Sequence, residues 1–347
     1  MYNISITATP PEKTINGYET ITYYNNSPDS LKRLVIRLVD NIHKPGAIRN
    51  ADADSDYITQ GITIDEVTIN GNKSKWDEDA GNYPWKYLAL PATLAPKSSL
   101  SLSFKWHFPI SKESNREGKI DSTTYFWAYC YPRVSVYDDY NGWDKIDFTD
   151  VQEFYNDFND YSLEVTVPKN YIVWATGDLQ NANKVLQSTF AKRLNDSYTS
   201  NDVIHIATTE DLKEKKVTAQ KDMNTWKWKA TDISDMTIAI SDHFVWDAAS
   251  VVVDDATKRR ASVLAAYNDT AKDFHRTVAY GQHSLDWLSH KSLGVPYPFP
   301  KTTIVQGFAD MEYLMMVNDG TNEDTSFSKF VVEHEIAHTW FPFYMGI

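Results

Sequence analysis

The stretch Phe330-Val-Val-Glu-His-Glu-Ile-Ala-His-Thr-Trp340 lies near the end of the 347-residue chain and contains the spacing His-Glu-x-x-His. On a helix, His334 and His338 lie on one face, one turn apart, and Glu335 lies beside them. Two imidazoles at this spacing can bind one tetrahedral zinc ion, with the glutamate near the open position of the metal. Zinc lowers the pKa of a bound water to about 7, so the carboxylate can take its proton. The stretch therefore predicts a zinc site with its own general base.

The residues around this motif favour a helix that packs against a core. Ser326 or Thr325 can cap its N-terminus. The apolar positions that would face the core are Phe330, Val331, Ile336 and Ala337. The alternative is two histidines and a glutamate on a solvated helix face, which these apolar and aromatic flanks disfavour.

Composition limits the classes of partner. The chain has a formal net charge of −13 and is 42% apolar and 14% aromatic, which suits packed cores and argues against binding nucleic acid or anionic membranes. The single cysteine, Cys130, excludes an internal disulfide and reads as a packed thiol. No apolar run reaches the roughly 18 residues of a membrane span, and no signal-peptide pattern follows Met1. We expect either a bacterial periplasmic or cell-envelope protein given without its export signal, or a cytoplasmic one.

The chain up to about residue 245 shows the period-2 alternation of β-strands, with no clear helical stretch between them. The alternating sets are Ile4/Ile6, Ile21/Tyr23, Leu34/Ile36/Leu38, Leu100 to Phe108, Leu163/Val165/Val167, Ile204/Ile206, Trp226/Trp228 and Ile238/Ile240. Hairpin turns are indicated at Asn16-Gly17, Asn70-Gly71 and Asn141-Gly142. The sequence therefore predicts antiparallel sheets, layered or saddle-like. Glu153 could face a cleft, although a surface carboxylate is the favoured interpretation.

The pattern becomes helical after a last strand pair at 250–253 and 261–267. Apolar residues spaced by four, seven and three predict a helix, which Asp269 or Thr270 can cap and Gly294 can end. These apolar residues are Phe274, Val278, Leu285 and Leu288. A short strand at 302–305 and the segment Gly307-Phe-Ala-Asp-Met-Glu-Tyr313 follow, in which Glu312 could be a second polar anchor of a cleft.

The Met-Glu segment together with the downstream His-Glu-x-x-His resembles the aminopeptidase N family of zinc metallopeptidases, which are gluzincins. Ala309-Asp-Met-Glu-Tyr313 matches in part the family motif G-x-M-E-N, and Gly294-Val-Pro-Tyr-Pro-Phe-Pro300 resembles its G-x-Y-P-Y-P turn. The segment 241–250 loosely resembles the junction into the catalytic domain of the family. Tyr131-Pro-Arg133 and 25–31 resemble parts of the N-terminal β domain of bacterial members.

The resemblance implies a mostly β N-terminal domain over residues 1–246, followed over 247–347 by the first, α+β part of a thermolysin-like catalytic domain. It also implies a zinc-dependent aminopeptidase that acts on peptides with a free N-terminus, with one Zn²⁺ in each complete catalytic domain. His334 and His338 would be zinc ligands, Glu335 the general base, and Glu312 the group that holds the free α-amine of the substrate. Met311, Ala309 and Asp310 would complete the substrate-binding segment.

Several positions depart from the family pattern. Ala309 and Asp310 replace small residues that line the substrate path, and Tyr313 replaces the usual Asn. Tyr129 stands where the family has a Gln that helps to bind the amine. The altered pair Ala309 and Asp310 favours an alternative, a non-catalytic binding or scaffold module on the same fold. A further alternative is a thermolysin-type endopeptidase joined to an unrelated β domain.

The third zinc ligand is the largest departure. In the family it is a Glu about eighteen residues after the second His, which here falls beyond Ile347, and two imidazoles leave a tetrahedral zinc half-satisfied. The family's transition-state Tyr lies later still. We therefore expect the chain as given to be an inactive fragment that binds zinc weakly or not at all and that needs the remaining C-terminal part of the same protein.

Overall fold

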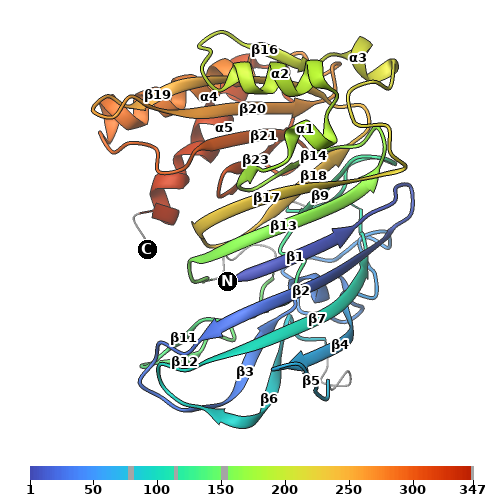
Figure 1. Ribbon diagram of the computed structural model, residues 1–347, viewed down its shortest axis with the longest axis vertical. Helices are drawn as coiled ribbons and strands as arrows, with labels where there is room; N and C mark the ends of the chain where they lie inside the picture. The colour runs from blue at the N-terminus through green and yellow to red at the C-terminus, as the bar shows by residue number, and fades with distance from the viewer. Residues whose placement is uncertain (77–81, 113–115, 150–154, 345–347) are drawn as a thin grey trace. The chain divides into compact units, whose positions relative to one another are not determined.

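The computed structural model describes residues 1–76, 82–112, 116–149 and 155–344 (Figure 1). The chain forms two compact units. Unit 1 comprises Met1–Lys112, Trp127–Thr166 and Ala230–Asp235, and unit 2 comprises Glu113–Phe126, Val167–Lys229 and Met236–Ile347. Three of the boundaries between the two units therefore fall inside strands, and the chain crosses from one unit to the other several times. The domain boundary predicted at residue 246 stays a prediction.

Unit 1 is built of β-strands, as its alternating pattern predicts. Its main sheet has the hydrogen-bonded order β13-β1-β2-β7-β4-β5. The strands are β1 (Tyr2–Thr7), β2 (Thr14–Tyr24), β4 (Thr63–Ile69), β5 (Asn72–Lys73), β7 (Ser99–Pro109) and β13 (Asn159–Pro168). The pairs are antiparallel except for β1 with β13, which is parallel, so the prediction of antiparallel sheets is correct only in part. Cys130 is buried, as predicted for a packed thiol.

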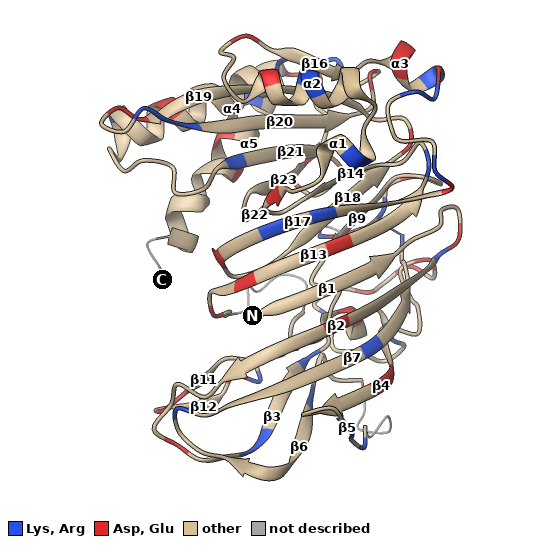
Figure 2. Cartoon of the chain, in the orientation of Figure 1, with Lys and Arg blue, Asp and Glu red and all other residues tan. Residues whose placement is uncertain are grey.

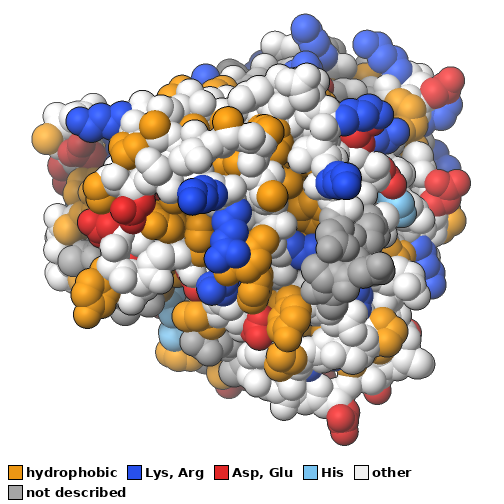
Figure 3. Space-filling view, turned by 90° about the horizontal axis from the view of Figure 1, so that it is seen from below, with side chains coloured by type: hydrophobic (Ala, Val, Ile, Leu, Met, Phe, Trp, Pro, Cys, Tyr) orange, Lys and Arg blue, Asp and Glu red, His pale blue; other side chains and the backbone are white. Residues whose placement is uncertain are grey.

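Smaller sheets complete unit 1. One has the order β10-β3-β6, and β11 pairs with β12. Their bounds are β3 (Leu31–Arg37), β6 (Trp85–Leu94), β10 (Arg133–Val134), β11 (Tyr137–Asp138) and β12 (Gly142–Trp143), and the 3-10 helix η1 (Val39–His43) follows β3. Figure 3 shows Lys and Arg side chains among hydrophobic ones on one face. Contacts of this kind occur between β3 and β6, where the Arg33 guanidinium lies 3.9 Å from the centre of the Tyr87 ring.

Two of the three hairpin signals mark turns. Asn70 and Gly71 have positive φ between β4 and β5, and Gly142, the first residue of β12, has positive φ directly after the turn from β11. The turn expected at Asn16-Gly17 is wrong, because both residues lie inside β2. A Cβ on Gly17 would come 2.1 Å from the indole of Trp106 on the neighbouring strand. Glycine at this position lets an aromatic ring lie against the backbone of the strand. The sequence alone does not distinguish a glycine of this kind from a glycine in a turn.

Unit 2 contains a six-stranded sheet of order β16-β19-β20-β21-β23-β22. Its strands are β16 (Ile204–Ala207), β19 (Val245–Asp254), β20 (Arg259–Tyr267), β21 (Lys301–Gln306), β22 (Met311–Tyr313) and β23 (Met316–Asp319). β21 is parallel to β20 and to β23, and the other pairs are antiparallel. The remaining strands are β8 (Gly118–Lys119), β9 (Tyr125–Ala128), β14 (Ile172–Ala175), β15 (Asp178–Leu179), β17 (Met223–Ile233) and β18 (Thr237–Ser241).

Helices interrupt the region that the sequence predicts as wholly β. They are α1 (Ala182–Val185), α2 (Ser188–Ser197) and α3 (Thr209–Lys213). In α2, Phe190 and Leu194 are one turn apart and buried. Thr208 and Asp211 form a reciprocal capping box at the start of α3. The sequence signals for these helices are short and polar. The period-2 alternation of the neighbouring strands is the stronger pattern, so the sequence predicts only strands in this region.

One face of the six-stranded sheet packs against α4 (Thr277–Trp287) and α5 (Thr325–Ala337) (Figure 1). A Cβ on Gly281 of α4 would lie 2.5 Å from Val263 and 3.5 Å from Ile336 of α5. Glycine thus lets α4 approach both β20 and α5 closely. The 3-10 helix η2 (Phe274–Arg276) precedes α4 and the π-helix η3 (Leu288–Ser292) follows it, with Gly294 at positive φ as predicted. Asp269 and Thr270 do not cap α4, because its N-cap is Arg276.

Charges of both signs are distributed over the elements (Figure 2). Lys227 and Lys229 lie on β17, whereas Asp160 and Glu164 lie on β13. Interspersed charges of both signs are typical of a solvated protein surface. None of the described helices is long and apolar enough to cross a membrane.

His243 in unit 2 lies between two carboxylates. Its Nδ1 is 2.8 Å from Asp242 and its Nε2 is 3.3 Å from Asp121. The hydrogen bonds to Asp121 and then to Asp242 raise the pKa of His243 from 6.5 to about 9. A raised histidine pKa stabilises the folded chain fully below pH 6.5, and this contribution disappears as the pH rises through about 9.

We therefore expect the free energy of unfolding to fall between pH 7 and pH 10, and to fall less in His243→Gln. Glutamine keeps a hydrogen-bonding side chain but carries no proton that titrates in this window. Urea unfolding midpoints of both proteins at the two pH values measure the difference. Parallel pH dependence in the two proteins would contradict the ion-pair role of His243.

Candidate functional site

The helix α5 carries the His-Glu-x-x-His motif. Asp324 caps it by accepting a hydrogen bond from the backbone N–H of Ser326 at 2.9 Å, so the predicted caps Thr325 and Ser326 are wrong by one or two positions. The helix ends at Ala337, and His338 follows as its C-cap with helical φ and ψ of −56° and −22°. The one-turn spacing of His334 and His338 therefore persists past the last helical residue.

The apolar side of α5 anchors the motif to the sheet. Val331, Val332 and Ile336 are buried, as this side of the helix requires. Phe330 was expected in the core but is 59% exposed, and its ring instead stacks on His334 with 5.7 Å between centres. The helix thus buries one stripe and presents an aromatic–imidazole pair on its exposed side.

The two imidazoles have the separation that a shared metal ion needs. His334 Nε2 and His338 Nε2 are 3.2 Å apart. Two nitrogens bound to a tetrahedral zinc at 2.0–2.1 Å lie about 3.3 Å from each other. Ligand atoms of His334, Glu335 and His338 all lie within 4.8 Å of one another.

A backbone carbonyl orients the second imidazole. His338 Nδ1 is 2.9 Å from the carbonyl oxygen of Phe341, which follows in the π-helix η4 (Thr339–Tyr344). A carbonyl can only accept, so Nδ1 carries the proton and the lone pair of Nε2 stays free. Support of this kind raises ligand basicity and fixes the ring. The donor set therefore fits zinc, although it supplies two imidazoles and not three protein ligands.

Carboxylates gather around the motif. Glu335 is 6% exposed, and burial, followed by the negative charges of Glu312 and Asp310, raises its pKa to about 8. Asp319 at the end of β23 is 1% exposed, and burial, Glu335 and Asp310 raise its pKa well above the usual range. Neither oxygen of Asp319 has a partner among the described residues. This concentration of negative charge favours a cation beside Glu335.

Glu312 lies on an edge strand next to this helix. β22 is the last strand of the six-stranded sheet, paired on one side with β23 so that Glu312 opposes Val317. α5 contacts both β22 and β23. No described strand pairs with β22 on its other side, and an extended peptide can pair with the backbone N–H and C=O groups along such an edge.

The other residues of the predicted substrate segment divide between loop and core. Ala309 and Asp310 lie in the turn before β22, and the Asp310 carboxylate accepts from the backbone N–H of Gly320 at 2.7 Å. Met311 starts β22 and is half-buried. Tyr313 is 5% exposed, donates its hydroxyl to the Arg116 carbonyl and packs on Phe126. The structure thus brings Glu312 and Asp310 to Glu335 and places the Tyr313 ring in the core.

Sequence reasoning missed two contributors to this site. Asp319 carried a signal only as an acidic residue at a strand end, and the Phe341 carbonyl carried none, because a backbone acceptor is independent of residue type. Tyr129, the position considered for a second amine anchor, is in unit 1 and packs on Phe148. Glu153 lies outside the described residues.

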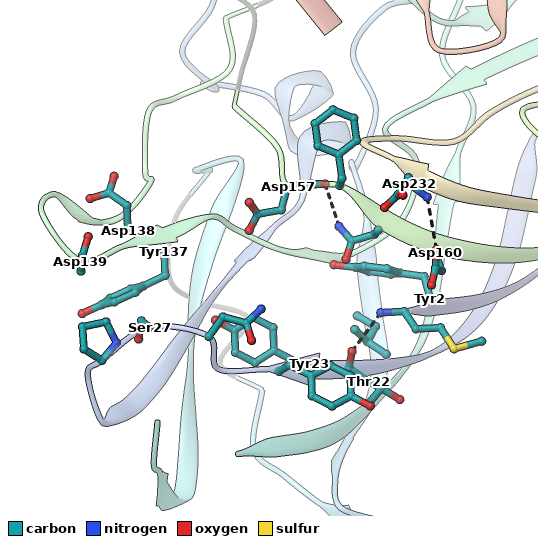
Figure 4. Close-up of a pocket in the computed structure, with 17 residues that line it drawn as sticks. Tyr2, Thr22, Tyr23, Ser27, Tyr137, Asp138, Asp139, Asp157, Asp160 and Asp232 are labelled. Atoms are coloured by element: carbon teal, nitrogen blue, oxygen red, sulfur yellow. Dashed lines mark hydrogen bonds between the residues drawn. The ribbon is translucent and has the colours of Figure 1, made fainter. Parts of the chain in front are cut away.

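A separate cavity of about 780 Å³ lies in unit 1 (Figure 4). Tyrosines and aspartates line it, among them Tyr2, Tyr23, Asp157 and Asp160. Burial and then the Asp157 charge raise the pKa of Tyr23 to about 12. None of the site residues predicted from the sequence lines this cavity.

The helix with His-Glu-x-x-His therefore packs on a mixed sheet, beside an edge strand that carries a glutamate. No family model and no curated protein sequence matches the chain. Solved structures do. An M1 zinc metallopeptidase from Deinococcus radiodurans matches with a TM-score of 0.56 and 13% identity. A mutant two-domain M1 zinc metallopeptidase bound to L-arginine matches with a TM-score of 0.59 and 13% identity.

Each alignment covers 98% of this chain and 63% of the solved one, so the chain spans less than two thirds of the length of these neighbours. A further neighbour is a mutant of the Deinococcus radiodurans enzyme bound to a Tyr-Ser-Ala substrate, with a TM-score of 0.56, 13% identity and the same coverage. At this identity the comparisons establish the fold: residues 1–347 resemble M1 zinc metallopeptidases over nearly their whole length.

Proposed function

We propose that the chain belongs to a zinc-dependent aminopeptidase. The observation that carries this proposal is the 3.2 Å separation of the His334 and His338 Nε2 atoms, with a Glu335 carboxylate oxygen within 4.8 Å of both. The fold of its structural neighbours supports the same chemistry.

His334 and His338 would hold the metal through Nε2. Zinc bound there supplies a Lewis acid that activates water and polarises a peptide carbonyl. Glu335 takes the proton of the attacking water on a carboxylate oxygen and passes it to the leaving amine. The pKa of Glu335 is raised in the chain without a metal ion. A divalent cation bound beside Glu335 would stabilise its carboxylate and lower that pKa.

Glu312 gives the proposed enzyme its preference for chain ends. The substrate backbone pairs with the free side of β22, and the Glu312 carboxylate then accepts hydrogen bonds from the free α-ammonium group. The ammonium group also meets the negative charge of Asp310, which helps to register the first peptide bond against Glu335.

Only two histidines form the described donor set, so we expect residues 1–347 to bind zinc weakly. The activity of the whole protein is part of the proposal, and the natural full-length product is the protein in which to measure it.

The test replaces Glu312 with glutamine and compares an aminoacyl arylamide with its N-acetylated form. Glutamine keeps the shape but loses the charge, and hydrogen bonds to charged groups contribute about 1.5–3 kcal/mol. We expect kcat/KM for the free-amine substrate to fall about 10- to 100-fold. Hydrolysis of the acetylated substrate, already poor, should not fall further.

Other outcomes separate the alternative functions. Efficient cleavage of blocked peptides by the unmodified protein would identify an endopeptidase instead. A zinc-loaded protein that hydrolyses neither substrate would favour a binding or scaffold module.

A further inference from the structure

A second cavity, of about 320 Å³, lies in unit 2 on the sheet face opposite α5. Side chains alternate between the two faces of a strand, and Arg260, Ser262 and Leu264 of β20 all line this cavity. Val263, between them, faces α4 near Gly281. The cavity is therefore separated from the candidate metal site by the thickness of the sheet.

The walls of the cavity come from several elements. Lys301 opposes Ser262 in the register of β20 with β21, and Trp246 comes from β19. The opposite wall is formed by residues of β15, of α2 with its C-cap Tyr198, and of β17; the others are Asp178, Leu179, Leu194 and Trp228. Tyr198 is 41% exposed and Asp178 is exposed, so these two residues mark the side open to solvent.

Lys301 is a buried cation at this cavity. It is 5% exposed, and its Nζ donates to the Ala175 carbonyl at 2.6 Å and to Thr303 Oγ1 at 3.0 Å. It also lies 5.1 Å from the centre of the Trp228 ring. An ammonium group has three donors, so one remains without an acceptor among the described residues.

Further donors at the cavity have no acceptor. The indole N–H groups of Trp228 and Trp246 are buried and have no partner in the described part of the chain, although the rings are 4% and 0% exposed. Arg260 uses Nε and one terminal nitrogen on Ser250 and Asn201, and no described group accepts from its other terminal nitrogen. A buried donor that makes no hydrogen bond destabilises the folded chain, so Lys301 and the two indoles favour an acceptor inside this cavity.

We propose that this cavity binds a small organic carboxylate with an apolar body. Its carboxylate would accept from Lys301, Arg260 and the indole N–H groups, and its body would lie against Leu179, Leu194 and Leu264. The volume is at the lower end for ligand pockets, which suits a small ligand. Among the described residues that line the cavity, Asp178 is the only acidic one, and Arg260 and Lys301 are the basic ones.

The test uses octanoate as the probe and octanol and octylamine as matched compounds of equal chain length. Residues 1–347 are titrated with each, and binding is followed by calorimetry and by emission of the lining tryptophans. We expect saturable binding of octanoate, at least tenfold weaker binding of octanol and no binding of octylamine. Equal binding of the three compounds, or no binding of octanoate, would overturn the proposal.

Two lysine variants test the assigned cation. Lys301→Met should weaken the binding of octanoate at least tenfold. Lys291→Met, which removes a surface lysine paired with Asp286, should leave the affinity for octanoate unchanged. If Lys301→Met does not fold, the comparison of the three compounds on the unmodified chain still tests the proposal. Octanoate binding should also survive His338→Ala, since that residue belongs to the other face of the sheet.

The pH dependence of binding gives an independent readout. Burial lowers the pKa of Lys301 to about 7, so its charge is present at pH 6 and largely lost at pH 8.5. Octanoate affinity should therefore fall over this range. The other charged or titratable groups facing Lys301 are Asp178, Tyr198 and Arg260. The effect should persist in Asp178→Asn, and its loss there would assign the titration to Asp178 and contradict the role of Lys301.

Discussion

Replacing Glu335 with glutamine is expected to lower kcat for aminoacyl arylamide hydrolysis by about 10²- to 10⁴-fold, the usual contribution of a general base. Glutamine has almost the same shape as glutamate but cannot take a proton from water. Zinc affinity should change by only a few-fold, because the imidazoles hold the metal. The measurement is steady-state hydrolysis by the natural full-length product in excess zinc, alongside a metal titration.

Glu333→Gln is the matched control, because Glu333 lies on the same helix but pairs with His283 of α4 and with Lys329. It should keep kcat close to that of the unmodified protein. If Glu335→Gln retained kcat within tenfold, Glu335 would not be the base, and the buried Asp319 would be the next carboxylate to examine.

The second large effect is on metal binding. Replacing His338 with alanine should weaken zinc binding to residues 1–347 by more than about 100-fold, because even the outer partners of metal ligands change affinity by 10–100-fold when removed. The variant retains only one imidazole of the described pair. Competition with a chromophoric chelator gives the affinity, and the visible spectrum of bound cobalt reports the geometry.

His283→Ala is the control for this experiment, since His283 on α4 pairs with Glu333 and is half exposed. Its affinity for zinc should equal that of the unmodified chain. Equal zinc affinities of His338→Ala and the unmodified chain would show that bound zinc lies elsewhere, and the proposed peptidase chemistry would lose its metal site.

The strands were the most predictable part of the fold. The alternating sets from Ile4/Ile6 to Ile238/Ile240 lie in strands, except that Leu38 falls just after the end of β3. Burial of one face imposes a period of two that is visible in the residues themselves. The helices α1 to α3 were not predicted, because their helical signals are short and polar. Gly17 shows the same limit, because the ring of Trp106 that requires it is 89 positions away.

The sequence by itself determined the pair of imidazoles, because a spacing of four on a helix places two side chains together through local geometry alone. Tertiary structure alone decided which carboxylates surround them. Glu312 and Asp310 reach Glu335 through the pairing of β22 with β23 and the packing of α5 on the sheet. Those contacts join residues that are far apart in the chain, and so do the walls of the donor-lined cavity on the opposite face of the sheet. The distances between such residues depend on how the strands and helices pack in the buried core.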